Sequence, residues 1–140
     1  MHKMKAFTLI LLGGLLLVDL SGSRESFGAA DLGLTRTHSG GGVTVKVTYL
    51  NPQGTDDTRF QVALDTHSVN LDGYDLKNLS LLRDDAGQSY QATKVENKGS
   101  GHHREITLIF PKPSDGTKRF ELVIQDIAKV KERSFSWDLK

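Results

Sequence analysis

The sequence predicts an all-β fold, an immunoglobulin-like sandwich of two antiparallel sheets with about seven strands. Apolar and polar residues alternate along most of the chain after residue 42, as they do in strands with one buried face. Turn-forming residues separate these runs at short intervals, and no stretch has the spacing of a long amphipathic helix. A small closed barrel is the alternative architecture.

The first four predicted strands lie between residues 42 and 96. GVTVKVTYL (42–50) and RFQVALDTH (59–67) each alternate strictly, and the turn-rich segment NPQGTDD separates them. NLSLLRDD (78–85) and QSYQATKVE (88–96) flank a hairpin turn in which Gly87 supplies the positive φ angle.

The last three predicted strands are REITLIF (104–110), RFELVIQDI (119–127) and RSFSWDL (133–139). Two prolines follow the first of these, and proline cannot donate to a strand ladder. Residues 126–131 are the one segment that could hold a helical turn. The longest region without alternation, residues 67–78, is expected to cross from one sheet to the other, and loops of this kind often carry function.

The N-terminal residues predict that the protein is exported. Two lysines precede a 13-residue weakly polar to apolar run, residues 6–18, which is short for a membrane span of ~20 residues and typical of a signal peptide. Cleavage is expected after Gly28-Ala29-Ala30, with Ser21-Gly22-Ser23 as the other candidate. The chain therefore divides into a signal peptide, 1–30, and a domain, 31–140, in the periplasm, cell envelope or medium. An uncleaved membrane anchor is the alternative.

Charge and composition exclude several function classes. Removing residues 1–30 takes away three basic residues (Lys3, Lys5, Arg24) and two acidic ones (Asp19, Glu25), which leaves 15 of each. A neutral domain without a basic cluster is a poor partner for nucleic acid. The chain has no cysteine, so thiolate chemistry and disulfides are excluded. No nucleophile elbow, paired catalytic carboxylates, P-loop or dinucleotide fingerprint occurs, so an enzyme is not expected.

The candidate metal ligands are Asp65, His67, His102 and His103. Imidazole suits Cu and Zn, so copper or zinc is the expected metal. If 101–110 is extended throughout, the adjacent imidazoles point to opposite faces and cannot share an ion. The hypothesis is therefore that one of the two meets His67 and Asp65 at one end of the sandwich. The alternative is that these side chains only order turns.

Further oxygen ligands occur in NLDGYDL, residues 70–76. Asn70, Asp72 and Asp75 suit calcium, although the spacing does not fit the twelve-residue calcium loop because Leu81 stands where the closing glutamate would be. Asp72, Asp75 and Arg104 are kept as candidate binding residues.

Four segments carry a resemblance: Ala63-Leu64-Asp65-Thr66-His67-Ser68, Tyr74-Asp75-Leu76, Leu82-Arg83-Asp84-Asp85-x-Gly87 and Gly101-His102-His103-Arg104. With them, residues 43–139 resemble an uncharacterised group of bacterial secreted modules. The resemblance implies export and a β-sandwich, and it implies no activity. The sequence thus predicts a binding or interaction module whose partner is a metal ion or a protein. A purely structural or protein-binding envelope domain without a ligand is the alternative.

Overall fold

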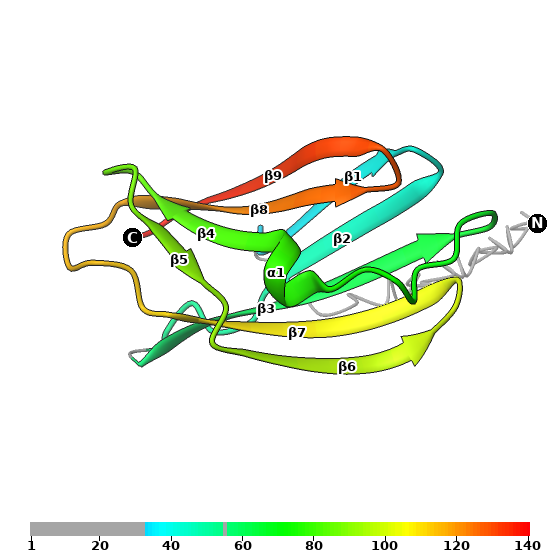
Figure 1. The fold of residues 1–140 in the computed structure, drawn as a ribbon. Helices are drawn as coiled ribbons and strands as arrows, with labels where there is room; N and C mark the ends of the chain where they lie inside the picture. The colour runs from blue at the N-terminus through cyan, green and yellow to red at the C-terminus, as the bar shows by residue number, and fades with distance from the viewer. Residues whose placement is uncertain (1–32, 55) are drawn as a thin grey trace, which may run out of the picture.

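The computed structural model describes residues 33–54 and 56–140, which form two antiparallel sheets consistent with a β-sandwich (Figure 1). The five-stranded sheet has the order β1 (Thr35–Gly40), β2 (Val43–Tyr49), β3 (Asp57–Thr66), β7 (His103–Pro111), β6 (Lys94–Ser100). The four-stranded sheet has the order β5 (Ser89–Gln91), β4 (Ser80–Asp84), β8 (Arg119–Ile127), β9 (Val130–Asp138). One short helix, α1 (Leu76–Leu79), lies on the connection from β3 to β4. The predicted signal peptide, residues 1–30, falls outside the described residues.

The residues that the alternating pattern predicts to be buried do form the core. The inward-facing residues of the strands are almost fully buried: Val43, Val45, Val47, Phe60, Val62, Leu64, Ile106, Leu108, Phe110, Phe120, Leu122, Ile124, Phe135 and Trp137. Five rings pack together at the centre of one half, with centroids 5.1–6.2 Å apart: Tyr49, Phe60, Phe110, Phe120 and Trp137. Burying this much apolar surface between the sheets is the main stabilising contribution.

The expected count of seven strands was too low, since the described residues contain nine. β1 was missed because its sequence TRTHSG is polar, so no alternation marks it, and only its pairing with β2 makes it a strand. The predicted strand 88–96 is two strands in different sheets, because the chain crosses between the sheets at Ala92 and Thr93. The hairpin turn at Gly87, with φ +83°, is confirmed.

The segment 126–131, which could have held a helical turn, does not form one. Residues there form a tight connection from β8 to β9, with positive φ at Asp126, Ala128 and Lys129. The helical turn lies instead at α1, where the Asp75 side chain caps the amide of Lys77 and Leu76 is buried. No helix of the described residues is long and apolar enough to cross a membrane.

Arg133 is buried at one end of the sandwich, where it hydrogen-bonds to both the β1–β2 turn and the β8–β9 turn. It is 1% exposed, and it donates to the carbonyls of Ile127 (2.9 Å) and Gly40 (2.7 Å). Burial lowers the pKa of its guanidinium. The β1–β2 and β8–β9 turns are thus held against each other at the end that also carries the predicted loop 67–78.

Candidate functional site

The pairing of β3 with β7 brings two of the four predicted metal ligands together. Asp65 and His103 are direct cross-strand partners on the outer face of the five-stranded sheet. His103 Nδ1 lies 2.5 Å from Asp65 Oδ1, and the two side chains are 74% and 54% exposed. His103 therefore points outward with Glu105, while Arg104 and Ile106 point inward, as the alternation of a strand requires.

The hydrogen bond to Asp65 assigns a role to each ring nitrogen of His103. An ionised carboxylate can only accept, so Nδ1 carries the proton and the neutral ring keeps its lone pair on Nε2. Histidines that bind metals commonly hold the second ring nitrogen to a carboxylate in this way. Asp65 is thus placed to orient His103, rather than to share an ion with it through its own oxygens.

His67 and His102 lie at the same end of the sandwich, outside the strands. His67 follows the last residue of β3, and His102 lies in the β6–β7 turn. The amide of Thr66 donates to the carbonyl of His102 at 3.0 Å, so the backbones beside the two histidines are joined. Both side chains are exposed. In the part of the chain that the structure describes, no three His, Asp or Glu side chains are arranged to hold a metal ion.

A shallow hollow of about 420 Å³ lies beside His103, over the small side chain of Ala63. One row across the sheet explains it: Lys46, Ala63, Glu105 and Lys98 are successive partners on β2, β3, β7 and β6. Ala63 is short, whereas its neighbours in the row are long. Among the described residues, neither Lys46 nor Lys98 forms an ion pair, so their ammonium groups remain open to a ligand.

Arg104 fixes the crossing loop against this edge of the sheet. It is 8% exposed, and its Nη1 donates to the carbonyls of Leu71 (2.6 Å) and Tyr74 (2.9 Å). Its Nη2 donates to Asn97 Oδ1 at 2.9 Å. The predicted binding residue Arg104 is therefore a buried residue that holds the loop through these three hydrogen bonds.

The carboxylates proposed for calcium are engaged in local hydrogen bonds. Asp72 Oδ1 accepts from the amide of Gly101 at 2.7 Å, and Asn70 Oδ1 accepts from the amide of Asp72. Asp75 caps α1 through one oxygen and accepts from Asn78 through the other. These bonds stabilise the loop, which is the turn-ordering role that such side chains often have.

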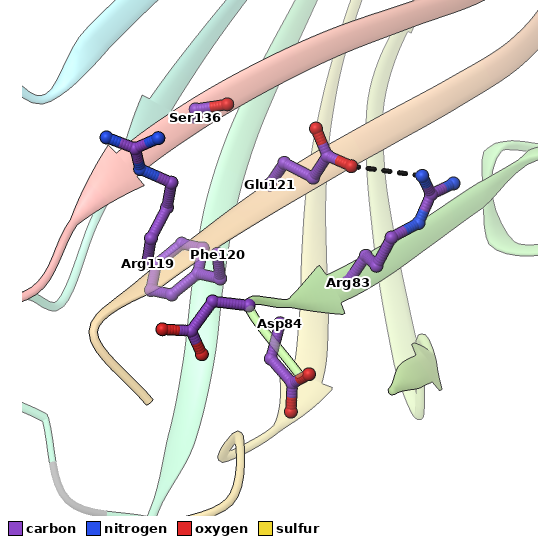
Figure 2. Close-up of a pocket in the computed structure, with 7 residues that line it drawn as sticks. Arg83, Asp84, Arg119, Phe120, Glu121 and Ser136 are labelled. Atoms are coloured by element: carbon purple, nitrogen blue, oxygen red, sulfur yellow. Dashed lines mark ion pairs between the residues drawn. The ribbon is translucent and has the colours of Figure 1, made fainter. Parts of the chain in front are cut away.

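A second hollow, of about 250 Å³, lies on the outer face of the four-stranded sheet (Figure 2). The ion pair from Arg83 to Glu121, 3.1 Å, spans one side of it, as the dashed line in Figure 2 marks. Arg119, which lines the other side, pairs with Asp138 at 2.7 Å. Both arginines of this hollow are thus already paired with carboxylates, and the hollow over Ala63 is the better candidate site.

Sequence reasoning identified Asp65 and His103 but missed Lys46, Ala63 and Lys98. Strand alternation predicts that these side chains point outward. It does not predict that they lie side by side, because that depends on the pairing of strands that are distant in the sequence. The one local signal is Ala63 itself, a small residue between Gln61 and Asp65 on the exposed face of a strand.

Comparison with known proteins adds no relative, since no family model, curated protein or solved structure matches this chain.

Proposed function

We propose that this chain is an exported, non-enzymatic binding module with an immunoglobulin-like β-sandwich, and that it binds its ligand at the face around Asp65 and His103. The observation that carries the proposal is the hydrogen bond between these two exposed side chains. It orients an imidazole at the surface beside a hollow, so the ring loses little further freedom on binding. Export rests on the N-terminal segment, and the absence of a recognisable catalytic motif favours binding over catalysis.

A transition metal, Cu(II) or Zn(II), is the ligand that we propose first. His103 Nε2 is the first ligand, held by Asp65, and His102 or His67 is the second. Because these two side chains are exposed on turns, they can rotate toward an ion without disturbing the core. The competing proposal is a structural or protein-binding envelope domain in which the same residues only order loops.

Titration of Cu(II) and Zn(II) into the purified full chain, followed by the thermal midpoint of unfolding, tests the proposal. A ligand at a hundred times its dissociation constant stabilises the folded state by ~2.7 kcal/mol, so the midpoint rises measurably. We expect His103→Ala to abolish the rise and His67→Ala to reduce it. Asp65→Asn should weaken binding by roughly 10–100-fold, because the orienting carboxylate is lost.

His38→Ala is the matched control, since His38 is an exposed histidine of β1 outside the proposed set. It should leave the rise unchanged. If neither metal raises the midpoint of the unaltered chain, metal binding is refuted and the structural proposal stands. An equal loss in the His38 variant would show that the metal binds to surface histidines in general.

A further inference from the structure

The strand β6 is a long open edge of the five-stranded sheet. It pairs with β7 on one side, and Figure 1 shows no described segment along its other side. At the opposite end of this sheet, the Arg36 side chain of β1 donates to the carbonyl of Ser136 of β9 at 3.2 Å, so β1 contacts the other sheet. An open edge presents backbone N–H and C=O groups that another strand can pair with.

The sequence of β6 is KVENKGS, and its charges are arranged about its middle residue, Asn97. Glu96 and Lys98 both point to the outer face, since their partners on β7 are Thr107 and Glu105. Each lies one residue from Asn97, and they carry opposite charges. A two-fold axis through Asn97 therefore places each of these charges opposite its complement on a second copy.

We propose that two copies of this chain associate through β6, antiparallel about Asn97, to form one continuous ten-stranded sheet. In this register Glu96 lies opposite the partner's Lys98, and Lys98 lies opposite the partner's Glu96. Side chains directly opposite in an antiparallel pair have Cβ atoms ~5 Å apart, close enough for ion pairs. The interface is self-complementary, as a symmetric dimer requires.

Charge also selects this register over its neighbours. Sliding the two strands by two residues places either Glu96 opposite the partner's Glu96 or Lys98 opposite the partner's Lys98, and like charges in direct opposition are destabilising. A slide of four residues that centres on Val95 restores opposite charges but pairs only residues 94–96 of each β6. The register centred on Asn97 pairs all seven residues of the strand.

The ion pair that Lys94 makes with Glu96 within one copy, 3.0 Å, does not prevent this arrangement. The two side chains are 65% and 56% exposed, and exposed pairs of this kind contribute little. Glu96 can therefore exchange Lys94 for the partner's Lys98 at small cost, or contact both.

The test is sedimentation equilibrium of the full chain and of two charge reversals, Glu96→Lys and Lys98→Glu. We expect the unaltered chain to dimerise and each reversal to weaken association by at least about tenfold, because two attractive pairs become repulsive. Mixing the two variants should restore association as a heterodimer, since one strand then carries two positive charges and the other two negative ones.

Lys112→Glu is the control, because Lys112 follows β7 at the far end of the sheet from the β6–β7 turn, and it should not change association. The circular dichroism of all variants should match that of the unaltered chain, since the altered side chains are exposed. A monomeric unaltered chain, or a dimer that both reversals leave intact, would overturn the proposal. Failure of the mixture to associate would refute the register.

Discussion

Replacing Arg104 with alanine should destabilise the protein and release the crossing loop. The substitution removes hydrogen bonds to the carbonyls of Leu71 and Tyr74 and to the side chain of Asn97. It also leaves a cavity beneath the loop, because Arg104 is 8% exposed. The carbonyl of Leu71, a residue that is 0% exposed, then loses its charged donor.

The magnitude follows from two opposing contributions. Each hydrogen bond made by a charged group contributes ~1.5–3 kcal/mol, so three contribute roughly 4–9 kcal/mol. Burying a guanidinium costs several kcal/mol, and the substitution relieves that cost. We expect a net loss of ~3 kcal/mol in the free energy of unfolding, which lowers the thermal midpoint by roughly 10–15 °C for a domain of this size.

Urea unfolding followed by tryptophan fluorescence measures this loss, because Trp137 is the one tryptophan of the sequence and lies in the core. Hydrogen exchange of the Leu71 amide, which donates to Gly101, reports on the loop itself. Arg104→Lys keeps the charge but not the planar fork, so an intermediate loss is expected. A loss below ~1 kcal/mol together with unchanged protection of the Leu71 amide would refute the tethering role.

Two further predictions concern a turn and a buried carboxylate. Gly41→Ala should cost more than ~2 kcal/mol of unfolding free energy, because Gly41 has φ +62° and an added Cβ would lie 2.1 Å from the carbonyl oxygen of Ala128. Urea titration should give only ~1 kcal/mol for the control Gly116→Ala, where φ is +86° but the space is open; equal losses would contradict the clash. Burial tends to raise the pKa of Asp84, but hydrogen bonds, that from Tyr90 foremost, outweigh it and hold the pKa below its usual value. The ionised Asp84 carboxylate therefore stabilises the folded state fully above the pKa of an unfolded aspartate, ~4. This stabilisation is lost as the pH falls below that value. Thermal midpoints measured from pH 6 to pH 2 should fall more steeply for the unaltered chain than for Asp84→Asn, and parallel curves would exclude this contribution.

Much of the fold could be predicted because burial on one face leaves a period of two in the sequence. Val43, Phe60, Ile106, Phe120 and Trp137 lie in the core where the alternation places them. β1 could not be predicted in this way, since its side chains are polar and its place depends on pairing with β2. The break between β5 and β6 was equally hidden, because both halves of the segment are mostly exposed.

The candidate site was half predictable. Alternation predicted that His103 shares a face with Glu105, and it does. It does not apply to His102, because β7 begins at His103 and His102 lies in the β6–β7 turn after Gly101, whose φ is +70°. The expected meeting of His67 with one of them stays a prediction, while the contact that the structure contains is between His103 and Asp65. That contact depends on which residue of β3 lies opposite His103, and strands 38 residues apart fix their pairing only when the core assembles.

The sequence by itself determined the all-β class, the inward faces of the main strands and the lack of cysteine chemistry, because these depend on residue type and local period. Only the tertiary structure decided the order of strands within each sheet, the row of Lys46, Ala63, Glu105 and Lys98, and the place of β6 at the end of its sheet among the described residues. The physical reason is that cross-strand neighbours are set by the joint burial of all apolar faces, a condition on the whole chain that no single segment carries.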